Sequence, residues 1–222
     1  MKEIIDQIFN LLSEKIGAKY QIYLVGGSTR DFLLNRKFDD FDFATDAPFD
    51  YLIEVFPHVK SSFPKYGIVN IEYKQYRITL ALMREEKMYI DKRHPTIIKF
   101  IDNPIDDARR RDYTINAIYI DQAGHIIDPF MGQDDLKKRI IRMIGDIPLR
   151  INEDPIRIIR AFRFEDQLGF NLEPHLEKYC RQNIWRVNQI NPYKLRLEYA
   201  KCSRAVYFKI QNLLTTSQRM IK

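Results

Sequence analysis

Two aspartates separated by one residue are the first side chains in this sequence whose spacing suggests chemistry. Asp40 and Asp42 alternate with Phe41 and Phe43, which is typical of a β-strand with one polar and one apolar face. Both carboxylates then project from the same face, where two like charges are unfavourable unless a cation neutralises them. Carboxylate oxygens suit Mg²⁺, so we expect a Mg²⁺ site here. Acidic doublets are also common on protein surfaces, and this pair alone does not establish a metal site.

A glycine turn lies shortly before the aspartates. The segment 24–31 reads as the end of a strand, then Gly26 and Gly27, then the start of a helix. Glycine lets the backbone approach a phosphate closely, and a helix N-terminus offers N–H groups to it. Arg30 would add a charge-assisted contact to the same phosphates. Most such turns only connect elements, but here an Asp-x-Asp pair follows, and the combination places a triphosphate site beside a metal pair, as two-metal phosphoryl or nucleotidyl transfer requires.

A basic run at residues 109–117 contains a second set of candidates. Consecutive arginines usually lie in a solvated loop, but next to a triphosphate site Arg111 can bind phosphate. Asp112 can accept hydrogen bonds from ribose hydroxyls, which would favour ribonucleotides. We therefore predict that Arg111 contacts phosphate and that Asp112 contacts ribose.

A third set of candidates follows an expected helix start. Asp154 and Arg157 are three residues apart and present an acceptor beside donors. This pair matches the donor and acceptor edge that cytosine and adenine share, and it opposes the edge of uracil and guanine. Arg160 and Arg163 continue around the helix and could reach phosphates or form salt bridges. Alternatively, Asp154 could simply cap a helix whose first residue is Pro155.

The expected elements place these residues in an α/β domain that is followed by helices. Apolar spacing predicts a helix over 4–16, and an alternating pattern predicts a hairpin with its bend at Lys74 and Gln75. Further elements are expected as a strand at 21–25, a helix at 28–34, a strand around 41–43, a helix at 48–56, and short strands at 115–121 and 125–128.

The remaining segments set the expected domain boundary. The polar segment from Arg84 to Pro95 reads as a mobile loop, and strand patterns stop after Asn152. We therefore predict a catalytic head over residues 1–150 and an all-helical neck over residues 151–222.

Bulk properties restrict the compartment and the partners. The 222-residue chain contains no run of about 20 apolar residues and no signal-peptide pattern, so no membrane association is expected. Cys180 and Cys202 lack metal-ligand spacing, which favours a reduced, cytoplasmic protein. The net charge is +6, and residues 178–222 contain ten lysines and arginines against one acid. This basic segment suits RNA, although a solvated helical surface would explain it equally well.

Taken together, the motifs resemble those of the class II, bacterial-type tRNA CCA-adding enzymes and the related poly(A) polymerases. The resemblance runs in order over about residues 20 to 170. It implies a polymerase-beta-like nucleotidyltransferase head, α+β in class with a mixed sheet and flanking helices, and a helical neck. The motifs that carry it are Leu24-Val-Gly-Gly-x-x-Arg-Asp31, Asp40-x-Asp-x-Ala-Thr45, Arg110-Arg-Asp-Tyr-Thr-Ile-Asn-Ala117, Asp128-Pro-Phe-x-Gly132 and Glu153-Asp-Pro-x-Arg-x-x-Arg160.

The resemblance also implies a role for each matching residue. Mg²⁺ is the implied cofactor, and the implied partners are ATP, CTP and the 3′ acceptor end of tRNA. The roles carried over are Mg²⁺ binding and activation of the tRNA 3′-hydroxyl for Asp40 and Asp42; triphosphate binding for Gly27, Arg30 and Arg111; ribose binding for Asp112; base choice for Asp154 and Arg157; and completion of the nucleotide pocket for Arg160 and Arg163.

The sequence departs from the family pattern in two ways. Family members usually carry a Glu on the strand beside the Asp pair, and the matching position here holds Thr79. The family's body and tail domains are not found before Lys222, so we expect a truncated or minimal form, or a partner that supplies the rest.

Three functions therefore stay open. The first is C and A addition to tRNA, and the second is an A-adding enzyme or a poly(A) polymerase. The loop expected from Arg84 to Pro95, in which Tyr89–Pro95 resembles the family's flexible-loop region, disfavours an enzyme that adds only C. The third is a non-catalytic RNA- or nucleotide-binding remnant. The sequence does not predict the oligomeric state.

Overall fold

The computed structural model describes residues 1–89 and 95–220, which divide into two compact units. The first unit comprises Met1–Lys87, Ile97–Arg111 and Ile115–Gln133. The second comprises Met88–Thr96, Asp112–Thr114 and Asp134–Lys222. The division into a catalytic head over residues 1–150 and a neck over residues 151–222 stays a prediction.

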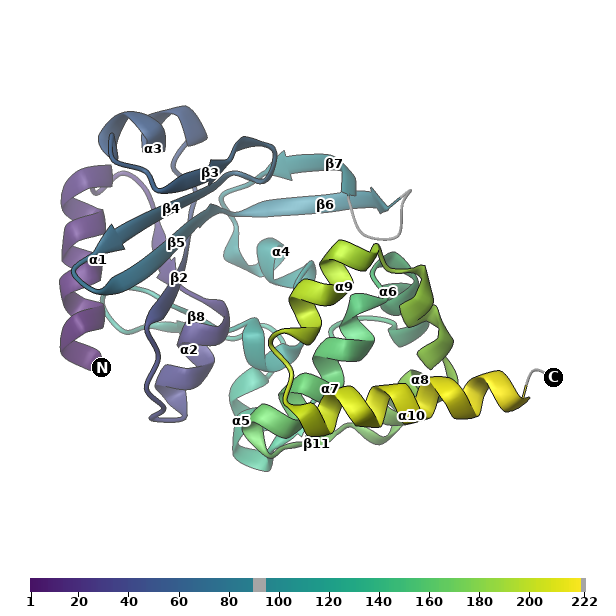
Figure 1. Cartoon of the computed structure of the whole chain (residues 1–222). Coiled ribbons are helices and arrows are strands. Elements are labelled where there is room, and N and C mark those ends of the chain that lie inside the picture. The colour runs from purple at the N-terminus through teal and green to yellow at the C-terminus, as the bar shows by residue number, and fades with distance from the viewer. Residues whose placement is uncertain (90–94, 221–222) are drawn as a thin grey trace. The chain divides into compact units, whose positions relative to one another are not determined.

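A seven-stranded mixed sheet is the centre of the first unit (Figure 1). Strands β2 and β5 run parallel, and the other neighbouring pairs run antiparallel. The strand that carries the Asp pair, β2, therefore lies inside the sheet with β1 and β5 as neighbours. In spatial order the strands are β3 (Ser61–Phe63), β4 (Ile68–Tyr73), β5 (Tyr76–Leu82), β2 (Asp40–Thr45), β1 (Ile22–Leu24), β8 (Tyr119–Ile120) and β9 (Ile126–Ile127).

Helix α1 (Lys2–Ile16) packs an apolar stripe against this sheet, as its spacing predicts (Figure 1). Phe9 is 1% exposed and meets Phe43 of β2 edge to face, with ring centroids 5.1 Å apart. Phe41 and Phe43 thus belong to the core, which leaves the other face of β2 to the aspartates. The other helical elements of this part of the chain are α2 (Gly26–Leu33), α3 (Phe49–Val55), α4 (Pro104–Arg109) and the 3₁₀ turns η1 (Pro64–Tyr66) and η2 (Thr114–Asn116).

Most of the expected elements in this unit are confirmed. The predicted hairpin is β4 and β5, and Lys74 at its bend has a φ of 56°. The strand expected over 115–121 is only partly formed, because η2 takes its first residues and β8 covers two residues.

The mobile loop predicted over Arg84–Pro95 is wrong for its described residues. Strands β6 (Arg84–Tyr89) and β7 (Pro95–Phe100) pair in a two-stranded sheet. Arg84 and Glu86 are about one-tenth exposed and pair with each other at 2.7 Å, so this strand is stabilised by charge and lacks an apolar alternation. Residues 90–94, which include most of the segment resembling the family's flexible loop, lie outside the described residues.

The second unit is mostly helical. Its core contains Tyr113, Phe162 and Cys180, and burial raises the pKa of the Cys180 thiol to about 12. The expectation that strands end before Asn152 is wrong at one place, because β11 pairs in parallel with β10. Both strands have two residues, too few for a periodic pattern. The elements are α5 (Gly132–Lys138), β10 (Ile140–Ile141), α6 (Ile147–Glu153), α7 (Ile156–Leu168), β11 (Asn171–Leu172), α8 (Pro174–Gln182), η3 (Ile184–Gln189), α9 (Pro192–Tyr199) and α10 (Arg204–Met220).

Among the described helices, none has both the length and the apolar character needed to cross a bilayer.

We expect Phe9→Ala to lower the free energy of unfolding by about 3–5 kcal/mol, because it leaves a cavity beside Phe43. Urea unfolding of the purified chain measures this loss. Phe63→Ala is the matched control, since Phe63 is 52% exposed and its truncation should cost little. Equal losses for the two variants would contradict the packing of α1 on β2.

Candidate active site

The Asp pair is fixed to the glycine turn by one serine. Ser28 Oγ donates a hydrogen bond to the backbone oxygen of Asp40 at 3.0 Å and accepts one from the backbone N–H of Asp42 at 2.8 Å. Ser28 is the third residue of α2, so its hydroxyl joins the first turn of this helix to the middle of the sheet. The carboxylates of Asp40 and Asp42 share the face of β2 opposite the core.

Gly26 is the point where two of the predicted groups, Asp42 and Arg111, meet. Its φ is 69°, and a Cβ atom added to it would lie 3.2 Å from Asp42 Oδ2 and 3.6 Å from Arg111 Nη1. A Cβ on Gly27 would lie 3.6 Å from Arg30 Nη2. Two glycines thus keep open a small space that a carboxylate and two guanidinium groups surround. The first N–H groups of a helix have no partner within the helix, so α2 begins with donors next to this space.

Arg30 has structural partners as well. Its guanidinium pairs with Asp31 at 2.7 Å and donates to Asn116 Oδ1 at 2.8 Å, and its side chain is 9% exposed. The structure therefore places Arg30 beside Gly27 with part of its charge balanced by Asp31. Its role as a phosphate ligand stays a prediction.

Strand β5 places Thr79 beside the Asp pair, as expected, together with the unexpected Arg77. In the parallel register Arg77 is opposite Asp40, and Thr79 is opposite Asp42. Arg77 contacts both carboxylate oxygens of Asp40, at 2.6 and 3.0 Å. Thr79 donates its hydroxyl to Asn70 Oδ1 at 3.0 Å. The strand position next to the aspartates thus carries a cation and a hydroxyl. In the described part of the chain, no three His, Cys, Asp or Glu side chains are arranged to hold a metal ion.

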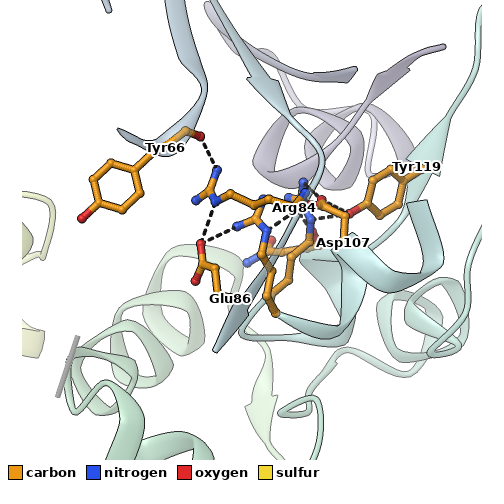
Figure 2. Close-up of polar contacts among 8 residues, drawn as sticks. Tyr66, Arg84, Glu86, Asp107 and Tyr119 are labelled. Carbon is orange, nitrogen blue, oxygen red and sulfur yellow. Dashed lines mark hydrogen bonds and ion pairs between the residues drawn. The ribbon is translucent and has the colours of Figure 1, made fainter. Parts of the chain in front are cut away.

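Arg111 is held by a buried polar network that also includes Asp107 and Tyr119. Its Nε donates to the Tyr119 hydroxyl at 2.7 Å, and its Nη2 donates to Asp107 Oδ2 at 3.1 Å. The Tyr119 hydroxyl in turn donates to Asp107 Oδ2 at 2.5 Å. Figure 2 shows Asp107 between Tyr119 on one side and Arg84 and Glu86 on the other.

The other oxygen of Asp107 binds the start of β6 and the residue that follows α4. Asp107 Oδ1 accepts from the backbone N–H of Arg84 at 2.9 Å and from Nε of Arg110 at 2.8 Å. Burial alone would raise the pKa of Asp107. The guanidinium groups of Arg110 and Arg111, with hydrogen bonds from Tyr119 and from the Arg84 N–H, hold that pKa below its ordinary value. The folded unit therefore favours the ionised form of Asp107.

In the second unit, Asp112 and Arg160 form an ion pair. The distance between Arg160 Nη2 and Asp112 Oδ2 is 2.8 Å, and Asp112 Oδ1 accepts from the N–H of Tyr113 at 2.8 Å. Burial lowers the pKa of Arg160, but Asp112, Glu198, Tyr113 and Asp154 raise it above its ordinary value. Two predicted residues thus touch each other, and the charge of Asp154 acts on the same guanidinium.

Asp154 and Arg157 both have local partners at the start of α7. Asp154 Oδ1 accepts from the N–H of Ile156 at 3.2 Å. Helix α7 begins at Ile156 and its N-cap position is Pro155, so the alternative of a helix that starts at Pro155 with Asp154 as its cap is one residue out of place. Nη1 of Arg157 donates to the carbonyl oxygen of Arg150 and pairs with Glu153 at 3.1 Å. The Arg157 side chain is 7% exposed. These contacts fix the pair in place, and base reading by it stays a prediction.

Arg163 lies in an ion pair between helices. Its Nε donates to Glu198 of α9 at 2.7 Å, and its guanidinium lies 4.2 Å from the centre of the Phe164 ring. The sequence left salt bridges open for Arg163, and the structure shows one. A role in the nucleotide pocket stays a prediction for both Arg160 and Arg163.

The structure thus gathers the candidates into two groups, one in each unit. Sequence reasoning missed Ser28, Arg77, Asp107 and Tyr119 as parts of the site. Arg77 was within reach, because it lies two residues before Thr79 on a predicted strand and must share its face. Asp107 and Tyr119 gave no such signal. The first group comprises Gly27, Arg30, Asp40, Asp42 and Arg111, and the second comprises Asp112, Asp154, Arg157, Arg160 and Arg163.

Comparison with known proteins identifies relatives of this arrangement. Residues 22–142 match the family described as the poly A polymerase head domain. A CCA-adding enzyme of Lactobacillus johnsonii is 37% identical over 201 residues, which are 90% of this chain and 50% of that protein. The crystal structure of the Bacillus stearothermophilus CCA-adding enzyme in complex with CTP is similar, with a TM-score of 0.76 at 33% identity, over 89% of this chain and 47% of that chain.

A tRNA nucleotidyltransferase complexed with a primer tRNA and an incoming ATP analog is also similar, with a TM-score of 0.71 at 27% identity. That match covers 97% of this chain and 61% of the other. This chain spans about half the length of the curated relatives that it matches. The expected fold is confirmed as a polymerase-beta-like nucleotidyltransferase fold. The chain belongs to the family of CCA-adding enzymes and poly(A) polymerases that share the poly A polymerase head domain.

Proposed function

We propose that this chain carries out nucleotidyl transfer to RNA and adds C, A or both to tRNA 3′ ends from CTP and ATP. Relatives that match most of this chain are named CCA-adding enzymes, and similar structures hold CTP or an ATP analog with a primer tRNA. One observation supports the proposal most directly: Asp42 and Arg111 both lie next to the space that Gly26 keeps open. An anionic, metal-binding group and a phosphate-binding group thus share one small site.

Asp40 and Asp42 fit a hard divalent cation. Mg²⁺ is usually bound by one or two carboxylates, and the phosphates of the substrate complete its shell. Two aspartates on one strand face meet this requirement without a third protein carboxylate, so Thr79 does not preclude binding. Mg²⁺ bound there would polarise the phosphate oxygens and lower the pKa of a bound hydroxyl.

The residues of the chain have separate tasks in the proposed reaction. The 3′-oxygen of the RNA bonds to the α-phosphorus of the nucleotide, the bond from that phosphorus to the bridging oxygen breaks, and pyrophosphate leaves. Gly27, with the first N–H groups of α2, binds the triphosphate. Arg30 and Arg111 balance its charge, and Asp112 accepts from the ribose.

Base choice is assigned to the start of α7. Asp154 and Arg157 present an acceptor and donors to the edge of C or A. Glu153 and the carbonyl of Arg150 restrain Arg157, which suits a group that must discriminate by position. Arg160 and Arg163 complete the pocket.

The basic segment 178–222 is proposed to contact the acceptor end of the tRNA. Some of its charge is balanced within the unit, since Lys209 pairs with Glu165 at 2.6 Å and Arg181 with Glu177 at 2.7 Å. Arg196 and Arg204 are exposed on α9 and α10 and can meet phosphates. A cytoplasmic location accords with the free thiols of the chain and stays a prediction.

The experiment that tests the function supplies the protein with Mg²⁺, each labelled NTP, and tRNA that ends before, within or after CCA. We expect ordered addition of C, C and A. Addition of A alone, or of a long A tail, would support an A-adding enzyme or a poly(A) polymerase. No transfer to any of the RNAs would contradict the proposal and favour a non-catalytic remnant.

In the same assay, Asp42→Ala should abolish transfer, because it removes a proposed ligand of the cation. Asp39→Ala is the matched control: Asp39 is an exposed neighbour in the bend before β2, and its loss should leave transfer unchanged. Full activity of Asp42→Ala would sink the metal assignment.

Arg77→Gln should strengthen cation binding by about fivefold, because it removes a positive charge from the carboxylate of Asp40. Titration of the protein with Mn²⁺ as a stand-in for Mg²⁺, followed by electron paramagnetic resonance, measures the affinity without any turnover. Lys60→Gln removes another exposed cation, paired with Glu72 at 3.3 Å, and serves as the control. An unchanged Mn²⁺ affinity for Arg77→Gln would show that Arg77 does not compete with the cation.

Arg157→Ala should reduce the preference for C and A over U and G by roughly tenfold, because a base-reading pair commonly contributes about 1–3 kcal/mol of discrimination. The values of kcat/KM for the four NTPs measure the preference, and the melting temperature reports on folding. Arg181→Ala removes an exposed arginine of the same unit and should leave the preference intact. Retained selectivity in a folded Arg157→Ala protein would contradict the assignment of base reading to this residue.

A further inference from the structure

The guanidinium group of Arg111 is restrained on every side that does not face the glycine turn. Its Nε meets the hydroxyl of Tyr119, its Nη2 meets Asp107, and its Nη1 approaches the carbonyl oxygen of Asn116 at 3.4 Å. Nη1 is also the nitrogen that lies 3.6 Å from a Cβ position on Gly26. The restraints therefore leave this end of the fork directed at the proposed phosphate site.

The restraining groups are themselves fixed. Asp107 is fully buried, and each of its carboxylate oxygens accepts from two donors: the Arg84 N–H and Arg110 on Oδ1, and Arg111 and Tyr119 on Oδ2. Tyr119 is also fully buried, and its hydroxyl both donates and accepts. Neither side chain can rotate without losing buried hydrogen bonds, which is costly.

A second carboxylate, Glu86, belongs to the same network. Glu86 pairs with Arg84 at 2.7 Å (Figure 2). Glu86 also lies 3.5 Å from Arg110. Asp107 serves Arg110 and Arg111. Among these five side chains, three guanidinium groups face two carboxylates. Arg111 is the member of the network that borders the Gly26 space.

We propose that Asp107 and Tyr119 are positioning residues, which hold Arg111 in the orientation that binds the triphosphate of the incoming nucleotide. This inference rests on the proposed function, since it takes Arg111 to be a phosphate ligand. A long arginine side chain loses much conformational entropy when it is ordered. When the side chain is already ordered before the nucleotide binds, this entropy loss no longer weakens binding. Neither Asp107 nor Tyr119 needs to touch the nucleotide.

A double-mutant cycle tests the inference through ATP affinity. Tyr119→Phe removes only the hydroxyl that bridges Arg111 and Asp107, and it keeps the ring that packs edge to face on Tyr23 at 5.9 Å. We expect Tyr119→Phe to weaken ATP binding about tenfold, and Arg111→Gln to weaken it at least as much. In the Arg111→Gln background, Tyr119→Phe should have almost no further effect. Equal losses with and without Arg111 would overturn the positioning role.

The reaction supplies a second measurement. Tyr119→Phe should raise the KM for ATP and for CTP by similar factors, because the triphosphate is common to both, and it should leave the C and A preference unchanged. Asp107→Asn should cause a larger rise in both KM values, because it also removes the buried negative charge. A change in base preference without a rise in KM would contradict the inference.

Two matched variants control for folding. Tyr23→Phe removes the hydroxyl of the neighbouring ring, which donates to Gln21 and not to Arg111. Asp106→Asn neutralises the adjacent carboxylate of α4, which is exposed and pairs with Arg109. Both should keep wild-type ATP affinity. If Asp107→Asn lowers the melting temperature strongly, the cycle with Tyr119→Phe still decides the question.

The outcomes separate the inference from the function on which it rests. Unchanged ATP affinity in Arg111→Gln would refute the phosphate role of Arg111 and with it part of the proposed function. A large effect of Arg111→Gln together with additive effects of Tyr119→Phe would refute only the positioning role.

Discussion

The first unit depends on a carboxylate that must stay ionised without contact with water. Asp107, which lies in α4, can do so only because two guanidinium groups, a phenol and a backbone N–H surround it, and these come from β6, the segment that follows α4, and β8. An isolated charge in such a place would be too costly to keep. The same contacts therefore join elements distant in sequence and orient Arg111. The buried contacts of Asp107 thus both stabilise the unit and orient Arg111 for an anionic ligand.

The proposed catalytic face depends on a second constraint, the alternation of side chains along β2. Phe41 and Phe43 are buried against the core, which forces Asp40 and Asp42 to the other face, where Ser28 ties the strand to the first turn of α2. The positive φ of Gly26 lets the chain turn close to Asp42. The core of the unit thus determines where the acidic pair is displayed.

The elements of this structure that could be predicted from sequence are those with a repeating apolar pattern. The apolar residues of helix α1 recur at helical spacing. In the hairpin of β4 and β5 and in the strand with the Asp pair, they recur at the spacing of a strand. Strand β6 was missed because its largely buried residues Arg84 and Glu86 are charged and form an ion pair. Apolar periodicity does not detect such residues. Strand β11 was missed because two residues contain no period. The fold class followed from a resemblance in motifs and is confirmed by the similar structures.

The candidate site was predictable to a similar degree and for similar reasons. The residues of the first group were found because their motifs are local, and the structure places Asp42, Arg30 and Arg111 around the two glycines. What the sequence could not supply was the partner of each charged group. Arg163 pairs with Glu198, 35 positions away, and Tyr119 reaches Asp107 across a segment with no pattern that links them. Such pairings depend on the tertiary fold and have no local signature.

Alternate residues of strand β5 are under two different selective constraints, one from the hydrophobic core and one from the site beside the acidic pair. Ile78 and Leu80 are fully buried, whereas Arg77 and Thr79 alternate with them and lie beside the acidic pair. An evolving lineage can therefore exchange an acid, a cation or a hydroxyl at these two positions while the hydrophobic interior remains the same. The side-chain chemistry at these two positions can therefore differ between close relatives without a loss of folding stability.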